Sequence, residues 1–335
     1  MKRIVLEAPG RFVELQVPAP INGPGEALVR MEKIGVCGSD FHAFAGRHPI
    51  YTYPRVLGHE LSGVVVEAPD NDKGIRPGDR CAIEPYLSCG TCRACLRGRN
   101  NCCEKIRVLG IHVDGGMQEF LAVPVGLLYK SEILSLDQLA LIETLGIGAH
   151  AIARSGLKPG EEALIIGAGP IGIAVAQFAS VLGAAVYVIE KSEWRRQFVE
   201  SMGYTASPTP ENRRAEVVFD ATGNAEAMGR SLEFVAAGGS LVYVGLTSDP
   251  VCINDSLFHR REITLLASRN SHNLFPRIIR LIEEGKIDTS HWITDRLALS
   301  EIPSQFQDLC TRQTLIKAIV DVQDGQDNGT LENRQ

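Results

Sequence analysis

Residues 162–190 read EALIIGAGPIGIAVAQFASVLGAAVYVIE. The stretch consists of an apolar run, a glycine-rich turn, a helix-forming run and a second apolar run that ends in an acid. It carries no charge from Ala163 to Ile189, and this length would be enough to span a membrane. Glycines and a proline divide it into short pieces, however, which favours a buried strand–helix–strand unit of a parallel sheet. We therefore predict no association with a membrane.

The turn GAGPIG matches the G-x-G-x-x-G pattern of dinucleotide-binding folds. Gly167 would allow the tight turn, Gly169 would let the backbone approach a pyrophosphate, and Gly172 would let helix and strand pack closely. Pro170 and Ile171 complete the pattern and are also predicted cofactor-binding residues. They begin a helix whose first N–H groups are free to bind phosphates. The alternative is a glycine-rich turn without a ligand, and the order strand, turn, helix and strand disfavours it.

Glu190 ends the second apolar run, eighteen residues after Gly172. An acid at this place accepts hydrogen bonds from a ribose diol and repels a 2′-phosphate, which predicts NAD rather than NADP. Lys191, Arg195 and Arg196 lie nearby and moderate this preference, and Arg195 is itself a candidate cofactor-binding residue.

The chain on either side divides into two patterns. The first 130 residues contain short strand-like runs broken by Gly and Pro, which predicts a β-barrel-like unit: RFVELQVP, EALVRMEKIGV, LSGVVVEAP, DRCAIEP and MQEFLAVPV. A helical segment, SLDQLALIETLGIGAHAIARSG, then leads into alternating strands and helices up to about residue 290. Between Gly203 and Ala215, two prolines predict a loop in place of a helix.

These patterns predict an α/β plus β fold, in which a β-barrel is followed by a doubly wound parallel sheet. The strand-like LIKAIVDV near the end is expected to rejoin the barrel. The predicted divisions are 1–140 for the barrel with a cysteine lobe at 88–103, 141–290 for the parallel-sheet domain, 291–323 for the rejoining segment and 324–335 for a flexible polar tail.

Composition narrows the classes of partner. The chain has 335 residues, a net charge of −6 and an isoelectric point near 5.8, which disfavours nucleic acid because phosphate binding requires a basic face. The first residues, MKRIVLEAPGRFVELQ, lack the apolar run of a signal peptide. We therefore expect a cytoplasmic protein whose cysteines remain reduced.

The stretch SCGTCRACLRGRNNCC, residues 88–103, holds five of the nine cysteines. Cys89, Cys92, Cys95 and Cys103 follow C-x2-C-x2-C-x7-C, a spacing typical of a zinc site closed by four thiolates and therefore structural. Cys102 is the spare cysteine, and spacing alone leaves an exchange with Cys103 open. The alternative is a set of reduced thiols without a metal.

A second possible metal site is dispersed along the chain. Cys37 lies in GVCGSDFH, and His59 and Glu60 lie in VLGHELSG. Cysteine, histidine and carboxylate together are typical of a catalytic zinc that keeps one position open, although each residue alone has an ordinary structural explanation. Glu143 is the only charged residue in LALIETLGIGAHA, where a carboxylate needs a partner or a metal unless the helix simply has a narrow polar face.

Together, GVCGSDFH, GHE, the four-cysteine lobe, the Glu143 segment, GAGPIG and DATG occur in the order of the zinc-dependent medium-chain dehydrogenase/reductase family, which the chain resembles over nearly its whole length. The resemblance implies a GroES-like catalytic barrel completed by the C-terminal segment, a Rossmann domain and an active site in the cleft between them. It also implies a homodimer or homotetramer. It assigns Cys37, His59 and Glu60 to a catalytic zinc, so that two zinc ions per chain are expected. Glu143 matches the acid of the family's E-P-L segment, here E-T-L, and either glutamate could be the further ligand.

The resemblance further implies that Ser39 and His42 form a proton relay and that Arg269, in ASRN, contacts substrate hydroxyls as in sorbitol dehydrogenases. YPRVLGHE, NCCEK and SRN are similar to bacterial L-galactonate oxidoreductases. The small-molecule substrate expected on these grounds is a sugar acid, whose carboxylate would suit an arginine. A neutral polyol or sugar, or L-threonine, is the alternative. A non-enzymatic NAD- and zinc-binding redox sensor and a zinc-free quinone reductase are less compatible with a second, open metal site.

Overall fold

The computed structural model describes residues 1–47 and 50–323, and the tail predicted at 324–335 lies outside the described residues. The chain forms two compact units. The first unit comprises Met1–Pro85, Arg107–Ala140 and the chain from Ile293 onward, and the second comprises Tyr86–Ile106 and Leu141–Trp292. Among the described residues, no helix combines the length and the apolar character needed to cross a membrane.

The first unit is built on a seven-stranded sheet in the order β16-β17-β3-β4-β5-β9, with β8 paired to β3, and a two-stranded sheet of β1 and β2. The strands assigned to this unit are β1 (Lys2–Ala8), β2 (Arg11–Gln16), β3 (Glu26–Val36), β4 (Glu60–Glu67), β5 (Arg80–Ile83), β7 (Arg107–Val108), β8 (Phe120–Pro124), β9 (Leu128–Lys130), β16 (Ile293–Ala298) and β17 (Lys317–Asp321). Its helices are α1 (Gly38–Phe44), η2 (Val125–Leu127), α3 (Leu136–Ala140), η4 (Leu299–Glu301) and α10 (Ile302–Thr311).

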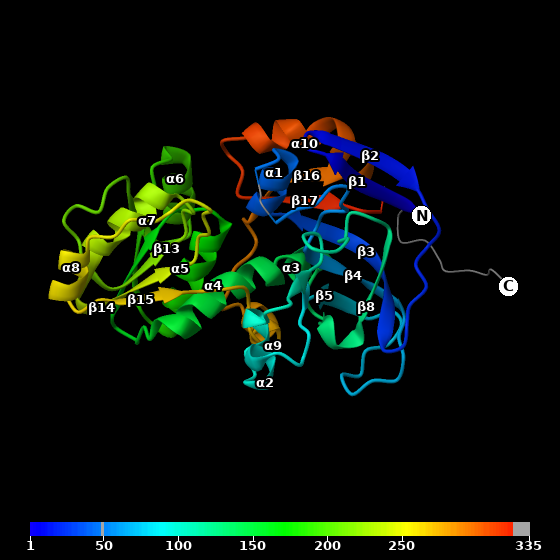
Figure 1. Cartoon of the computed structure of the whole chain (residues 1–335), viewed down its shortest axis with the longest axis horizontal. Helices are drawn as coiled ribbons and strands as arrows, with labels where there is room; N and C mark the ends of the chain where they lie inside the picture. The colour runs from blue at the N-terminus through cyan, green and yellow to red at the C-terminus, as the bar shows by residue number, and fades with distance from the viewer. Residues whose placement is uncertain (48–49, 324–335) are drawn as a thin grey trace. The chain divides into compact units, whose positions relative to one another are not determined.

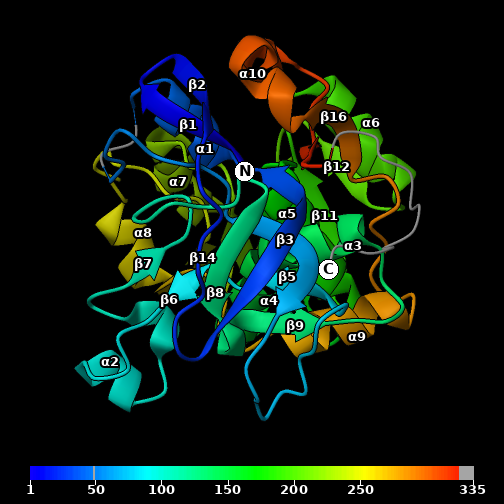
Figure 2. The same cartoon turned by 90° about the vertical axis from the view of Figure 1, so that its right-hand side faces the viewer.

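Strand β3 organises this unit because it pairs antiparallel with three neighbours, β4, β8 and β17. Figure 2 shows β8 lying along β3. In β3, residues Ala27, Val29 and Met31 are fully buried at alternate positions, as expected for a strand with one face on the core. Strand β17 comes from the C-terminal segment, and Ala318 pairs with Val36 at the end of β3.

The second unit contains a six-stranded, wholly parallel sheet in the order β12-β11-β10-β13-β14-β15. The strands of this sheet are β10 (Glu162–Ile166), β11 (Ala185–Ile189), β12 (Thr205–Ser207), β13 (Ala215–Asp220), β14 (Val235–Tyr243) and β15 (Thr264–Ala267). The second unit also contains the short strand β6 (Tyr86–Leu87). Its helices are α2 (Arg93–Leu96), η1 (Asn100–Cys102), α4 (Ile142–Ser155), α5 (Pro170–Leu182), α6 (Glu193–Ser201), α7 (Ala225–Ser231), η3 (Leu232–Phe234), α8 (Asp255–Arg260) and α9 (Phe275–Glu283).

Helices cover both faces of this parallel sheet (Figure 1), so its strands are apolar on both sides. Leu164 and Ile166 of β10 join a buried cluster with Leu241 on one face. Ala163 and Ile165 point to the opposite face and are also fully buried. The predicted class, a barrel-like sheet with a doubly wound parallel sheet, is thus confirmed.

The structure refines two local predictions. The helical segment predicted at 135–156 is two helices, α3 and α4, because α3 packs on β4 and β5 of the first unit whereas α4 packs on α5 of the second. The segment after Gly203 contains the short strand β12, which pairs with β11, before the predicted loop. In that loop Glu211 and Asn212 adopt left-handed backbone angles, φ 47° and 63°.

Candidate active site and metal sites

The first unit brings Cys37, His59 and Glu60 together. Cys37 follows β3 and caps α1. His59 directly precedes β4, the antiparallel neighbour of β3, and Glu60 is the first residue of that strand. One ligand atom from each residue lies within 4.8 Å of the others. His59 and Glu60 are buried and Cys37 is half-buried. This donor set, one sulfur, one imidazole nitrogen and one carboxylate oxygen, suits zinc.

The side chain of Glu60 is fixed from two sides. It lies over Gly35, where an added Cβ would be 2.0 Å from Oε2, so only glycine fits at that position. Lys317 approaches from β17, with Nζ 2.6 and 2.7 Å from the two carboxylate oxygens and 3.3 Å from the carbonyl oxygen of Val36. Both charged side chains are at most 2% exposed, so they form a buried, bidentate ion pair.

Asp40 is a second buried acid behind this cluster. Its Oδ2 accepts a hydrogen bond from the backbone N–H of Cys37 at 2.9 Å, and its Oδ1 lies 3.8 Å from Nδ1 of His59. Burial raises the pKa of Asp40, and His59 and the Cys37 N–H oppose that rise. The 3.8 Å separation is too long for a hydrogen bond, so Asp40 places a carboxyl group beside the imidazole without fixing its orientation.

Ser39 and His42 lie three residues apart on α1, so they are neighbours on its surface. Ser39 is half-buried and His42 is exposed. The buried hydroxyl of Tyr51 lies in the same region. Burial raises the pKa of Tyr51 above its ordinary value, Asp40 adds to the rise, and the hydrogen bond with Ser39 opposes it.

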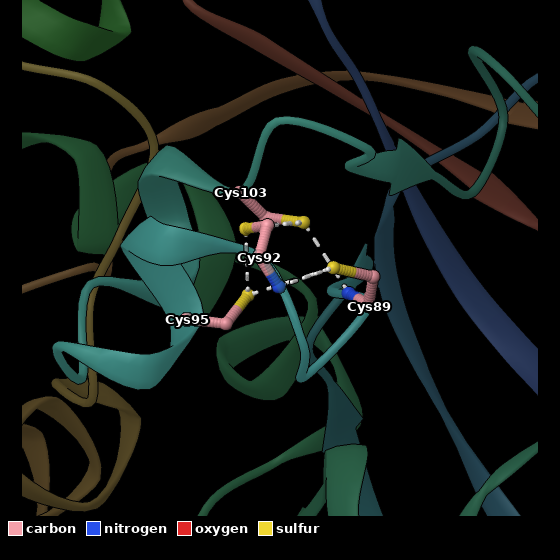
Figure 3. Close-up of side chains that lie close together, drawn as sticks. All are labelled: Cys89, Cys92, Cys95 and Cys103. Atoms are coloured by element: carbon pink, nitrogen blue, oxygen red, sulfur yellow. Dashed lines mark hydrogen bonds between the residues drawn. The ribbon is translucent and has the colours of Figure 1, made fainter.

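The four cysteines of the lobe converge in the second unit, as Figure 3 shows. The Sγ of Cys92 lies 3.5 Å from that of Cys95 and 3.9 Å from that of Cys103, and the Sγ atoms of Cys89 and Cys95 are 4.0 Å apart. Backbone N–H groups point at the sulfurs, and those of Thr91 and Cys92 lower the pKa of Cys89.

The lobe's geometry fits a metal held by four thiolates, the set that closes a structural zinc site. Cys103 belongs to the group, whereas Cys102 is exposed and lies outside it. The lobe belongs to the second unit with the rest of Tyr86–Ile106.

Glu143 lies in the first turn of α4, where its side chain is buried. Its Oε1 accepts a hydrogen bond from the hydroxyl of Tyr86, which is buried as well. The carboxylate therefore has a polar partner within the second unit. Its predicted place beside the cluster of Cys37, His59 and Glu60 stays a prediction.

The glycine turn between β10 and α5 has the shape that its sequence predicts. Gly167 has φ 98°, and an added Cβ at Gly172 would lie 1.8 Å from the carbonyl oxygen of Gly167, so both positions require glycine. Gly169 is the N-cap of α5, followed by Pro170 and Ile171 in its first turn. The first N–H groups of α5 have no partner within the helix and can bind phosphate oxygens.

Glu190 follows β11 and faces this turn. Its Oε2 accepts from the N–H of Ala168 at 2.7 Å, and its Oε1 accepts from the N–H of Ser192 at 2.8 Å. The nearest atom to an added Cβ at Gly169 would be a guanidinium nitrogen of Arg195, 4.0 Å away. The turn thus has a fixed carboxylate on one side and a cation beside it.

Arg269 follows the end of β15, and its side chain is exposed. Its carbonyl oxygen accepts a hydrogen bond at 2.9 Å from Nδ2 of Asn101, a buried residue of the lobe.

Sequence reasoning missed four polar residues that support these groups: Asp40, Tyr86, Asn101 and Lys317. Only Lys317 gave a signal, since it is the single charge inside the otherwise apolar run LIKAIV. A lysine within a buried strand needs an acid nearby.

Comparison with known proteins assigns the chain to a class. The family model for the alcohol dehydrogenase GroES-like domain matches residues 23–133, and that for zinc-binding dehydrogenases matches residues 170–284. The chain belongs to this family of zinc-type alcohol dehydrogenases, and it is an oxidoreductase that uses zinc and a nicotinamide cofactor.

One relative is the L-galactonate-5-dehydrogenase of Escherichia coli K12, which is 37% identical over 96% of this chain and 98% of its own length. Two solved structures each cover 96% of this chain and are themselves covered to 99%. A zinc-binding dehydrogenase from Sinorhizobium meliloti 1021, bound to NADP, has 31% identity and a TM-score of 0.88. The RspB alcohol dehydrogenase from Escherichia coli CFT073, complexed with NADH, has 27% identity and a TM-score of 0.90.

Proposed function

We propose that the protein oxidises a secondary alcohol of a sugar acid with NAD, at a catalytic zinc held by Cys37 and His59. The observation that carries the proposal is the group of Cys37, His59 and Glu60, whose ligand atoms lie within 4.8 Å of one another. A metal site of this donor set that is not closed by four thiolates leaves room for a substrate oxygen. The second zinc is structural and belongs to the four-cysteine lobe.

When bound, zinc supplies a Lewis acid for the substrate hydroxyl, and the nicotinamide supplies the hydride acceptor. Asp40 places a carboxyl group 3.8 Å from Nδ1 of His59. Lys317 holds the Glu60 carboxylate and neutralises its charge. The family resemblance names Glu143 as the alternative ligand, and within its own unit the hydroxyl of Tyr86 donates to that carboxylate.

Ser39 and His42 act on the proton of the substrate hydroxyl. As the carbinol carbon loses its hydride, that proton passes to the Ser39 hydroxyl, then to the His42 imidazole, and from this exposed ring to water. The products are a ketone, NADH and a proton. Arg269 pairs with the substrate carboxylate, for which a planar guanidinium is well suited.

The preference for NAD rests on Glu190. Two backbone N–H groups hold its carboxylate, which supports the proposal that it accepts from a ribose diol and repels a 2′-phosphate. Arg195 beside Gly169 would contact the pyrophosphate. The relationship to both an NADP-bound and an NADH-bound structure makes direct titration of the two cofactors the necessary test.

The function is tested by NADH formation with a panel of aldonates, neutral polyols, sugars and L-threonine. Activity confined to one aldonate would support the proposal, and activity confined to a polyol or L-threonine would replace its substrate. Cys37→Ala and His59→Ala should lose turnover and one zinc per chain but still bind NAD. Turnover retained in both variants would rule out zinc chemistry at this site.

The assembly and the compartment stay predictions. The family resemblance favours a homodimer or homotetramer, which sedimentation would measure. A cytoplasmic location is proposed from the sequence alone, and fractionation of the cells would test it.

A further inference from the structure

One buried amide in the second unit joins three separate segments of the chain. Asn101 lies in η1, two residues before Cys103, and is 2% exposed. Its Nδ2 donates to the carbonyl oxygen of Arg269 at 2.9 Å and lies 3.2 Å from Nε2 of His150. A single side chain of the cysteine lobe therefore contacts both α4 and the segment after β15.

The contact with His150 requires that Nε2 of this ring accept. Burial, together with the neighbouring His272, Arg99 and Arg154, lowers the pKa of His150 to about 4. The ring is therefore neutral at neutral pH, and its proton can reside on Nδ1. In that state both hydrogen bonds from the Asn101 amide are satisfied at once.

The segment after β15 needs such support because its own backbone is irregular. Asn270 and Asn273 adopt left-handed φ angles of 53° and 56°. Apart from glycine, asparagine is among the residues that tolerate this conformation best. His272 makes a second link to the lobe, with Nε2 2.5 Å from the carbonyl oxygen of Gly98. The lobe thus holds this segment at Arg269 and again at His272.

We propose that Asn101 is a positioning residue for Arg269, so that the four-cysteine lobe contributes to substrate binding. The proposal rests on the proposed function, in which Arg269 pairs with the substrate carboxylate. The Arg269 side chain is exposed, and its backbone is anchored through Asn101. An arginine that starts from a fixed backbone loses less conformational freedom when it binds an anion, so the anchor strengthens binding without touching the substrate.

The test is Asn101→Leu, which removes both hydrogen bonds with little change in side-chain size. The matched control is Asn100→Leu, the exposed preceding residue in the same turn. With L-galactonate as probe, we expect Asn101→Leu to raise KM about tenfold, equivalent to about 1.4 kcal/mol. The value of kcat should change less than about twofold. KM for NAD and the zinc content should equal those of the control.

A double variant separates positioning from a general structural role. If Asn101 acts through Arg269, Asn101→Leu should add no further rise in KM to Arg269→Ala. Two effects that multiply would overturn the proposal. If Asn101→Leu fails to fold, His272→Ala is the alternative variant, because it removes the second link at a partly exposed position. It should raise KM several-fold. An unchanged KM would overturn the proposal.

The failure of this inference can be told from failure of the proposed function. If Arg269→Ala leaves KM unchanged, the assigned role of Arg269 is wrong and the inference falls with it. If Arg269→Ala raises KM but Asn101→Leu does not, only the inference is wrong. If no aldonate is oxidised, hydrogen exchange of the amides at 267–273 decides: faster exchange in Asn101→Leu than in Asn100→Leu supports positioning, and equal exchange overturns it.

Discussion

Replacing Lys317 by methionine would remove the cation that neutralises the buried Glu60 carboxylate. The ammonium nitrogen lies 2.6 and 2.7 Å from the two carboxylate oxygens. At an effective dielectric constant of about 20, charges at this separation attract by about 6 kcal/mol before the cost of desolvation is subtracted. Removing one partner of such a pair typically costs about 3–5 kcal/mol, because the other charge stays buried. We expect Lys317→Met to lower the free energy of unfolding of the first unit by this amount.

The assay is urea unfolding followed by circular dichroism, with and without added zinc. Lys317→Arg keeps the charge and should lose much less stability. The double variant Glu60→Gln, Lys317→Met removes both charges and should recover most of the loss. A loss in Lys317→Met below about 1 kcal/mol, the range of a surface ion pair, would refute the reasoning. So would a double variant as unstable as the single one.

Three further predictions concern the second unit. Cys103→Ser should lose one zinc per chain and Cys102→Ser none, as measured by metal analysis, and the reverse result would exchange their roles. Glu190→Ala should weaken NAD binding about tenfold while NADP binding changes less, because a charged acceptor for the ribose diol is lost; an unchanged ratio of the two dissociation constants would contradict this role. The pKa of His150 is about 4 in the folded protein, below its ordinary value of 6.5. Between these two pH values the unfolded chain binds more protons than the folded chain. The free energy of unfolding therefore falls as the pH decreases from 6.5 to 4. Urea unfolding at pH 7 and at pH 4.5 measures this loss of stability. In His150→Gln the loss between the two pH values should be smaller by about 2–3 kcal/mol. An equal loss in both proteins would show that the ring does not cause it.

The parts of the site that the sequence predicted are those encoded locally. In GAGPIG the residues that determine the turn are close in sequence. A Cβ at Gly172 would collide with the carbonyl oxygen of Gly167, only five residues away. The four cysteines of the lobe are equally local, because they occur within fifteen residues and are joined by short turns. Such patterns can be interpreted without knowledge of the tertiary structure.

The features that the sequence did not predict depend on distant partners. Nothing near Glu60 indicates that Lys317 neutralises it, and nothing near Asn101 indicates that Arg269 accepts its hydrogen bond. Strand β12 was missed for a related reason. Its three residues, Thr205–Ser207, have no apolar pattern and are a strand only because they pair with β11.

The pairing of Glu60 with Lys317 also bears on why the first unit is discontinuous in sequence. The chain leaves this unit at Ala140 and returns only at Ile293, so the lysine arrives after the whole second unit has been made. Strand β17 pairs with β3 and thereby brings the ammonium group of Lys317 to the Glu60 carboxylate. Burial of a carboxylate is unfavourable unless a cation or hydrogen-bond donors accompany it. The C-terminal segment is therefore an integral part of the first unit, because it supplies the positive charge that allows Glu60 to be buried there.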